Sequence, residues 1–369
     1  MRFLLVVGLA LAAIAPITPQ TRSAPLRLNE IQIIGSHNSY HAGLTPGMMA
    51  WLKKHDPQAA QTLDYRHPPL DQQLSSGVRQ LEIDVFADTQ GGRYAKPTAP
   101  NLLKIDGLEP DAPFDTEGLF QKPGFKVMHV QDIDYHSNCQ PFTGCLGVIL
   151  AWSNAHPGHL PIFVLIETKD SQKRRPFQVA PEPFTPAVFD ALDQEIRSVI
   201  PRSKMLLPDD VRREHKTLEE SILSDGWPSL DEARGKLIFL LDQRKAEADY
   251  VEGHPSLEGR VIFTNAAPGS PDAAFVEVND PLTDPNLIPS LVRKGYMVRT
   301  RTDADLVQAR ANDVTQRDAA LASGAQMLST DFPFNERASW TGYSVRFPNG
   351  GIVRCNPVLK PGTCVVPER

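Results

Sequence analysis

The residues best suited to chemistry stand together near the start of the chain, where positions 35–40 read Gly-Ser-His-Asn-Ser-Tyr. They follow an apolar run at positions 31–34, which is typical of a buried parallel strand. His37 and Asn38 then lie where this strand leaves the core, and in an α/β barrel that end of a strand faces the active-site mouth. The pattern therefore predicts that an imidazole and a carboxamide face a reaction site.

A second candidate segment, positions 69–85, reads as a helix that runs into a strand. Its helical half repeats an apolar residue at every fourth position from Leu70, and its strand half alternates apolar with polar residues. Glu82 and Asp84 stand two apart on the strand, so their side chains share one face. Paired carboxylates repel each other and usually persist where a cation neutralises them. A solvated strand face is the alternative, but beside the first segment we favour a metal site.

Together the two segments resemble the signatures of the calcium-dependent phosphoinositide-specific phospholipases C, and among these the secreted bacterial subgroup. The resemblance rests mainly on positions 31–170. It implies a phospholipase C-like phosphodiesterase in which His37 and His129 are catalytic. It also implies four metal ligands: Asn38, Glu82, Asp84 and Glu167. The stretch between Asp84 and His129 is longer than the family pattern, which an insertion at positions 90–124 explains.

The implied metal set contains only oxygen ligands, as a hard cation requires, and the lack of cysteine or histidine ligands argues against zinc. Three carboxylates favour calcium or magnesium, and the resemblance selects Ca²⁺. Such an ion lowers the pKa of a hydroxyl and neutralises charge on a phosphate. Two imidazoles then divide proton donation and transition-state stabilisation. The general base stays open, since Glu82 or Glu167 can accept a proton as easily as a histidine.

Further polar residues at strand ends have two interpretations each. Lys169 either reaches the substrate phosphate or lies at the surface. Arg299 shares a strand face with Arg301, so one of them binds an anion or both pair with acids. Asp242 and Asp331 end predicted strands and are equally suited to capping helices. Six histidines in polar or proline-rich loops are expected to be solvated: His41, His55, His67, His136, His156 and His159.

Eight apolar segments predict strands that alternate with helical patterns: 31–34, 81–85, 126–130, 161–169, 236–242, 261–265, 296–301 and 326–331. This rhythm predicts an irregular (β/α)₈ TIM barrel of the phospholipase C-like phosphodiesterase type. One helix begins at Thr185 with a proline in its first turn, and another spans positions 313–323. Positions 90–124 read as a loop without periodicity. Positions 48–52 read as a buried helical turn in preference to a lipid contact.

The chain has 369 residues, enough for one barrel with long loops, and no linker divides positions 25–369 into two domains. An apolar stretch at positions 3–14 is typical of a signal peptide, which we place at 1–24 with its cleavage site left open. The simplest pairing of the four cysteines is Cys139–Cys145 and Cys355–Cys364, which makes 333–369 a disulfide-tied C-terminal tail. We expect an exported protein, either secreted or periplasmic.

The net charge of −6 gives no general attraction to nucleic acid or to anionic membranes, so any membrane contact is local and transient. The resemblance implies a monomeric enzyme that cleaves phosphatidylinositol-type lipids to diacylglycerol and inositol phosphate through a cyclic phosphodiester. A glycerophosphodiester phosphodiesterase is the nearest alternative, but that family begins with His-Arg-Gly in place of Ser-His-Asn-Ser. A secreted inositol- or sugar-binding barrel without catalysis is the remoter alternative.

Overall fold

The computed structural model describes residues 25–170, 175–360 and 366. Its strands are β1 (Ile31–Ser36), β2 (Gln80–Phe86), β3 (Lys126–Val127), β4 (Ile162–Thr168), β5 (Leu237–Leu241), β6 (Ile262–Phe263), β7 (Phe275–Glu277), β8 (Met297–Arg301), β9 (Met327–Thr330) and β10 (Val353–Cys355). Its longer helices are α1 (Pro46–His55), α2 (Pro57–Thr62), α3 (Leu70–Ser76), α4 (Ala99–Ile105), α5 (Phe142–Ala155), α6 (Pro186–Val199), α8 (Leu218–Ser224), α11 (Leu287–Lys294) and α13 (Thr315–Ser323). Its shorter α-helices are α7 (Pro208–Val211), α9 (Leu230–Ala233), α10 (Glu247–Val251) and α12 (Val307–Ala311).

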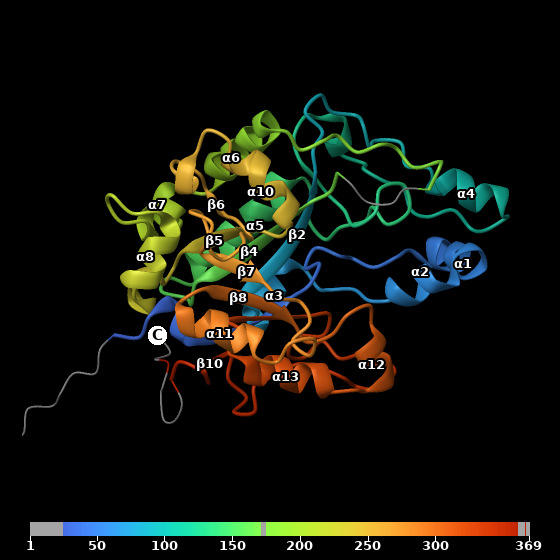
Figure 1. Ribbon diagram of the computed structural model, residues 1–369. Helices are drawn as coiled ribbons and strands as arrows, with labels where there is room; N and C mark the ends of the chain where they lie inside the picture. Colours follow the sequence, from blue (N-terminus) through green and yellow to red (C-terminus); the bar gives the residue numbers. More distant parts are fainter. Residues whose placement is uncertain (1–24, 171–174, 361–365, 367–369) are drawn as a thin grey trace, which may run out of the picture.

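Eight strands of the described chain form a nearly closed parallel barrel in the middle of the molecule, with helices around it (Figure 1). Their order is β6-β5-β4-β2-β1-β9-β8-β7, and every neighbouring pair in it runs parallel. The ring is weakest between β6 and β7, where an isolated bridge joins Asn265 to Phe275. The predicted irregular (β/α)₈ TIM barrel is confirmed.

For one of the eight predicted strands, the prediction that it belongs to the barrel is wrong. The segment predicted at 126–130 forms only the short β3, which pairs antiparallel with the end of β2 and lies outside the parallel ring. Its place in the ring is taken by β7, which pairs with β8 through Val276 and Val298. A strand of three residues is too short to show a periodic pattern, so the sequence gives little sign of it.

The predicted loop at 90–124 is also wrong in part, because it contains α4. This helix packs with α1 and α2 over a second, smaller hydrophobic cluster outside the main core. Met48, Trp51 and Leu52 are buried in that cluster, so the buried helical turn predicted at 48–52 is confirmed. Figure 1 shows α1, α2 and α4 together on one side of the barrel.

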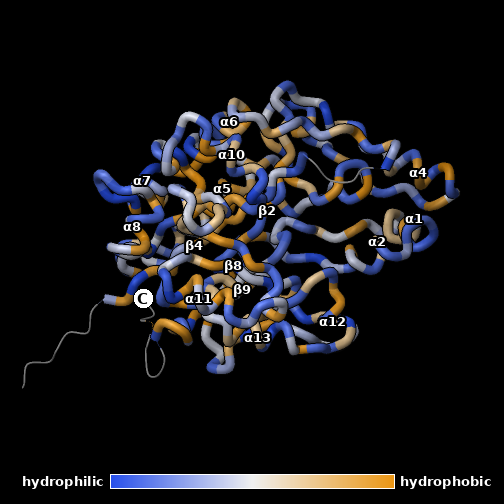
Figure 2. Tube along the Cα trace, viewed as in Figure 1, coloured by the Kyte–Doolittle hydropathy of each residue, from blue (hydrophilic) through white to orange (hydrophobic). Residues whose placement is uncertain are grey.

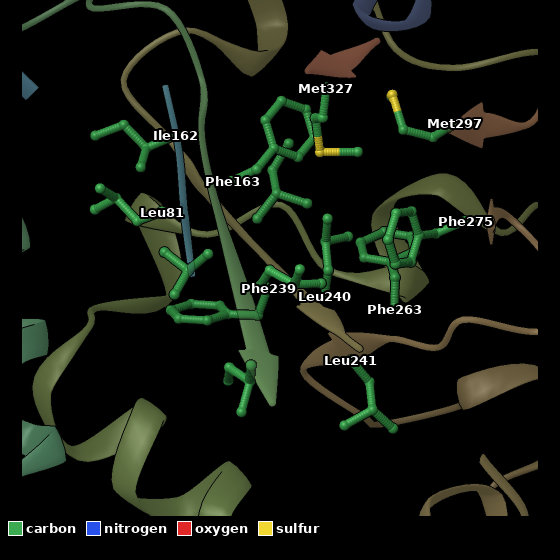
Figure 3. Packing of buried hydrophobic residues seen from close by; sticks show 14 of the residues in the cluster. Leu81, Ile162, Phe163, Phe239, Leu240, Leu241, Phe263, Phe275, Met297 and Met327 are labelled. Carbon is green, nitrogen blue, oxygen red and sulfur yellow. The ribbon is translucent and has the colours of Figure 1, made fainter. Parts of the chain in front are cut away.

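The main core consists of the strands and the apolar faces of the surrounding helices. Figure 2 shows hydrophobic residues concentrated along β4, β8 and β9 in the middle of the molecule. Figure 3 shows part of this core, where Phe163, Phe239 and Phe263 come from β4, β5 and β6. Burying each such side chain contributes about 1.5–3 kcal/mol, which makes this barrel a rigid frame for the residues at its strand ends.

Local signals in the sequence place several element boundaries correctly. The helix predicted from Thr185 is α6: the Thr185 hydroxyl accepts a hydrogen bond from the Val188 amide, and Pro186 is the first helical residue. The helix α13 lies within the predicted range 313–323. Thr185 satisfies an amide group that no helical partner can reach, and Pro186 lacks an amide hydrogen, so these two residues fix where α6 begins.

A disulfide bond and an additional antiparallel strand complete the fold. Cys139 and Cys145 form the predicted disulfide; the second predicted pair includes Cys364, which lies outside the described residues. The strand β10 pairs antiparallel with the first half of β1, from Ile31 opposite Cys355 to Ile33 opposite Val353. In the part of the chain that the structure describes, no helix has both the length and the apolar character needed to cross a membrane.

The substitution Gly35→Ala tests how tightly the barrel is closed at β1. A Cβ atom at this position would lie 2.0 Å from the Gln80 side-chain oxygen on β2, so the Gln80 side chain or its strand must shift. We predict a loss of about 1–3 kcal/mol in the free energy of unfolding, the usual cost of overpacking. Urea denaturation of the variant and the wild type measures it.

The matched control is Gly147→Ala within helix α5, where a Cβ atom would meet no other group within 4 Å. This change should be neutral or stabilise the protein by about 0.5–1 kcal/mol, because alanine favours helix. If both substitutions leave stability unchanged, the close approach of Gln80 to Gly35 is not a constraint on the fold.

Candidate active site

Three carboxylates from two neighbouring strands, β2 and β4, meet at the barrel mouth. Glu82 and Asp84 point to the same face of β2, and strand register places Glu167 of β4 directly opposite Asp84. One oxygen atom from each of the three carboxylates lies within 4.8 Å of the others. The parallel pairing of β2 with β4 thus brings together residues that are far apart in the sequence.

Lys169 lies inside this carboxylate cluster and not at the surface. Its Nζ is 2.8 Å from Asp84 Oδ2 and 2.9 Å from Glu167 Oε1, and its side chain is 7% exposed. Burial, and then the charge of Glu167, raise the pKa of Asp84 well above its ordinary value. Burial alone would also raise the pKa of Glu167, but Lys169 overcomes it and lowers that pKa. The ammonium group therefore opposes the effect of burial at both carboxyls: it outweighs burial for Glu167, whereas for Asp84 burial and the charge of Glu167 outweigh it.

The third carboxylate, Glu82, is bound by Arg299 from β8 across the barrel. Arg299 Nη2 lies 2.5 Å from Glu82 Oε2, and both side chains are buried. Burial raises the pKa of Glu82 to about 7, although the guanidinium opposes that rise. Arg299 also donates a hydrogen bond to the Asn279 side-chain oxygen, and its Nη1 lies 4.0 Å from Glu277 Oε2. Arg299 is therefore paired with acids in this structure.

Asn38 presents its carboxamide beside the carboxylates. Its φ of 47° lies in the left-handed region, which asparagine tolerates better than most residues and which turns the chain sharply after β1. The Asn38 amide nitrogen donates to the Tyr65 hydroxyl at 2.8 Å. Its oxygen lies 3.4 Å from the Tyr40 hydroxyl, which in turn hydrogen-bonds Asp84. The oxygen of Asn38 therefore lies on the side of the carboxylate cluster.

His37 is held between a carboxylate and a guanidinium. Its Nδ1 lies 2.7 Å from Asp331 Oδ1, and Arg301 Nη1 lies 3.1 Å from its Nε2. The same Nε2 is 3.5 Å from Glu82, which links His37 to the carboxylate cluster. Burial, and then the charge of Arg301, lower the pKa of His37 well below its ordinary value. The imidazole is therefore neutral at pH 7.

Asp331 was not assigned to the site from the sequence, where it was equally suited to capping a helix. Its position follows from barrel closure, because β9 pairs with β1 and places Thr330 opposite Ser36. The next residue on each strand then projects into the mouth, so Asp331 meets His37. The predicted barrel already implies this position for Asp331, because the last strand of a closed ring must lie beside the first.

His129 is also backed by a carboxylate, since its Nδ1 lies 2.9 Å from Asp134 Oδ2. Burial lowers the pKa of His129, and Asp134 opposes this effect. A row of rings connects the two candidate catalytic histidines. The ring centroids of His129 and His41 are 5.5 Å apart, those of His41 and Tyr65 4.5 Å, and those of Tyr65 and His37 6.3 Å.

Three of the six histidines expected to be solvated are buried, so that prediction is wrong for them. His41 contacts Asp134, and His159 contacts the Ser153 hydroxyl. His67 lies 2.6 Å from Glu336 and bonds the backbone carbonyl of His37 at 2.8 Å. Composition of a loop indicates that it is polar, but it does not tell whether another segment covers it.

The residues at the mouth fit a hard divalent cation. The carboxylates of Glu82, Asp84 and Glu167 converge, and Asn38 adds a neutral oxygen at their edge. Oxygen-only sets of this kind suit calcium or magnesium, whereas zinc sites use cysteine and histidine. A parallel barrel whose mouth holds such a cluster beside two carboxylate-backed imidazoles has the features of a metal-assisted hydrolase.

The chain belongs to the family of Ca²⁺-dependent phosphoinositide phospholipases C, because the model of that family matches residues 26–357. Members of the family are phosphoric diester hydrolases, and calcium is the cation in the family's description. The match favours this reading over the glycerophosphodiesterase and over the barrel without catalysis. No curated protein matches the chain.

Solved structures of calcium-dependent bacterial enzymes have the same fold. The phospholipase C of a Pseudomonas species, in its apo form, is 15% identical with a TM-score of 0.54, and the match covers 92% of this chain and 98% of that one. The same enzyme with myo-inositol is 14% identical, covers 90% and 96%, and has a TM-score of 0.54. The Streptomyces antibioticus enzyme is 20% identical, covers 83% and 95%, and has a TM-score of 0.51.

The pH dependence of phosphodiester cleavage tests the environment of His37. An imidazole accepts a proton only when neutral, and the lowered pKa of His37 places the acidic limb of kcat/KM below pH 6.5. We predict that Arg301→Gln moves this limb to higher pH, because it removes a positive charge beside the ring. Arg301→Lys retains the charge and should leave the limb in place. Identical limbs in both variants and the wild type would exclude Arg301 as the cause.

Proposed function

We propose that the chain cleaves phosphatidylinositol-type phospholipids to diacylglycerol and inositol phosphate through a cyclic phosphodiester, in a calcium-dependent reaction. One observation carries the proposal: the Glu82, Asp84 and Glu167 cluster lies beside two imidazoles that each have their own carboxylate. Buried carboxylates and imidazoles of this kind cost stability, and such groups gather at functional sites, so the arrangement favours catalysis over binding alone. The family match supplies the substrate class.

We place the calcium ligands at Asn38, Glu82, Asp84 and Glu167. A bound Ca²⁺ would supply positive charge that favours ionisation of a hydroxyl and neutralises the phosphate. Lys169 and Arg299 already bring positive charge to the same carboxylates, with contacts of 2.8 Å and 2.5 Å. We propose that these two cations also contact the phosphate or the headgroup once the substrate enters.

The two histidines divide the proton transfers in this proposal. Each imidazole has one nitrogen bound to a carboxylate, His37 to Asp331 and His129 to Asp134, which leaves Nε2 for proton transfer; in His37 this nitrogen also lies 3.1 Å from Arg301 Nη1. One of them, in its neutral form, accepts the proton of the inositol 2-hydroxyl at Nε2, and the other, in its protonated form, gives its Nε2 proton to the departing diacylglycerol oxygen. The inositol 2-hydroxyl attacks phosphorus, the bond from phosphorus to the glycerol oxygen breaks, and a cyclic inositol phosphate results.

An internal hydroxyl is a better nucleophile here than water. Held next to the phosphorus on the same ring, it has a large effective concentration, which contributes several kcal/mol to lowering the barrier. Glu82 lies 3.5 Å from His37 and has a pKa of about 7, so it is a second group able to accept a proton at this position. Both acceptors give the same cyclic product.

The remaining expectations concern the state of the protein in the cell. We propose that 1–24 is a signal peptide, that 25–369 is one barrel domain whose C-terminal tail begins at 333, and that the protein is exported as a monomer. We also propose a transient contact between the barrel mouth and a membrane, without any affinity for nucleic acid. Large apolar side chains are exposed on elements beside the mouth: Ile105 at 80% on α4, Val307 at 62% on α12, and Trp340 at 40% after β9.

Calcium dependence is tested by chelation and by one isosteric substitution. We predict that excess chelator abolishes turnover of phosphatidylinositol and that calcium restores it better than zinc. Asp84→Asn removes a buried negative charge from the cluster and should weaken calcium binding by roughly 10-fold or more, a common scale for damaged metal sites. Isothermal titration with calcium measures this affinity directly.

Asp88→Asn is the matched control for the calcium measurement. Asp88 is also buried near the end of β2, but its carboxylate pairs with Lys126 and lies outside the cluster. Its substitution should leave calcium affinity unchanged. Full turnover in excess chelator, or equal affinity in both variants, would contradict the proposed calcium site.

Product analysis by phosphorus NMR tests the nucleophile. We predict diacylglycerol plus inositol phosphate, part of it cyclic, and little turnover of a lipid whose 2-hydroxyl is methylated, because that lipid lacks the internal nucleophile. Release of glycerol 3-phosphate from a deacylated diester, with no diacylglycerol from the intact lipid, would instead identify a glycerophosphodiesterase.

A further inference from the structure

The loop that carries His129 folds back on itself and places a carboxylate under the imidazole. The backbone amides of His129 and Val130 both donate to the Asp134 carbonyl, and the Asp134 amide donates to the Val130 carbonyl. This tight turn brings Asp134 Oδ2 to 2.9 Å from His129 Nδ1. The contact is therefore fixed by the main chain of the loop as well as by the two side chains.

The same carboxylate contacts a second imidazole that comes from the other side of the site. His41 is fully buried, and its Nε2 lies 2.9 Å and 3.1 Å from the two Asp134 oxygens. The backbone of His41 is anchored in turn, since its amide donates to the Asn38 carbonyl and its carbonyl accepts from the His67 amide. The position of His41 is thus fixed by its backbone, and its ring holds the Asp134 carboxylate by hydrogen bonding.

The charge of Asp134 is stabilised by these two rings. Burial would raise the pKa of this carboxyl, yet its pKa lies below the ordinary value, because His41 and His129 hydrogen-bond its charged form. The groups that face His129 from other elements are His41 and Lys169, and both lower its pKa. Asp134 is the group that opposes them.

A metal ion at this second cluster is the alternative explanation, since the three side chains lie close enough to surround one. The distances argue against it. Nitrogen and oxygen ligands about 2.0–2.2 Å from a tetrahedral zinc ion lie more than 3 Å from each other. The Asp134 oxygen is 2.9 Å from a ring nitrogen of His129 and the same distance from one of His41. These are direct hydrogen bonds.

We propose that Asp134 is a positioning residue for His129, and that His41 holds Asp134 in place. A carboxylate bound to Nδ1 fixes the ring orientation and the tautomer, so that the proton of neutral His129 stays on Nδ1 and Nε2 faces the reacting groups. The inference rests on the proposed function, in which His129 acts on the phosphodiester. It assigns the site two residues, Asp134 and His41, that were not among those predicted from the sequence.

The experiment compares Asp134→Asn with a matched control two residues away. Asparagine has no negative charge, so its hydrogen bonds to the two imidazoles are weaker than those of the carboxylate. We therefore expect kcat to fall by about 10- to 100-fold, a range typical of lost orienting partners, with KM nearly unchanged. The control is Asp132→Asn. Asp132 is buried in the same loop, but it binds the Thr98 and Val179 amides, and no histidine among the described residues is hydrogen-bonded to it. We expect this control to lower the melting temperature and to leave kcat within a factor of about two.

A spectroscopic readout separates positioning from a structural role. Nitrogen-15 NMR of histidine-labelled, calcium-loaded protein, with His129→Gln used to assign the signals, reports which ring nitrogen carries the proton. We expect Nδ1–H for His129 in the wild type and in Asp132→Asn, and loss of that single tautomer in Asp134→Asn. An unchanged tautomer in Asp134→Asn would overturn the proposal, as would a loss of kcat no larger than in the control.

His41 provides a second and independent variant. The side-chain amide of His41→Gln can still donate to the Asp134 carboxylate, whereas His41→Leu cannot. We expect His41→Gln to retain most of the wild-type kcat and the Nδ1–H signal, and His41→Leu to lose both. Equal behaviour of these two variants would overturn the role of His41. Because the tautomer is read without substrate, failure of the proposed phospholipase activity would leave the NMR result intact and the two failures distinguishable.

Discussion

The burial of three carboxylates within 4.8 Å of one another is the constraint on which the rest of the site depends. Each uncompensated buried charge costs several kcal/mol, so the fold must bring positive charge to the same place. Lys169 supplies it from the strand that carries Glu167, and Arg299 supplies it from the opposite side of the barrel. Both cations are held by strand register, which explains why a rigid parallel barrel is suited to this chemistry. The same set of charges includes Asp331, which contacts His37, and Arg301, whose positive charge lowers the pKa of His37. The neutral state of His37 therefore depends on these charges as well.

The barrel could be predicted from the sequence because most of its strands are long apolar runs with polar ends. The segments around β4 and β5 are continuously apolar, and both strands lie where they were expected. The exchange of the segment at 126–130 for β7 has a physical cause. Residues 126–127 form a short strand that pairs antiparallel with the end of β2 and so stays outside the ring. The strand β7 is also short, with three residues, but it pairs parallel with β8 and so joins the ring. Pairing partners, and not periodicity, decide which short segments join the ring.

The candidate site divides in a similar way. Residues that belong to local motifs, such as Glu82 with Asp84, could be found because their spacing alone puts them on one face of a strand. Asp331 could not, since it acts through a partner on another segment, and Asp134 could not, since only a turn of the folded loop brings its carboxylate against the His129 ring. Asp331 is 294 residues from His37 along the chain, and Asp134 is 93 residues from His41. The same reasoning explains His41 and His67, whose loops are polar in composition and yet are covered by segments that sequence pattern does not connect to them.

The pairing of β1 has a consequence for how the protein assembles. This strand stands near the beginning of the described chain, but it pairs with β9 and β10, whose residues come roughly three hundred positions later. Contacts of such long sequence separation form late, because the entropy of closing the loop must be met before they stabilise anything. The catalytic arrangement around His37 therefore cannot exist on a chain that still lacks its C-terminal strands. Assembly of the reaction site coincides with completion of the barrel, so the chain acquires activity at the same step at which it becomes a folded protein.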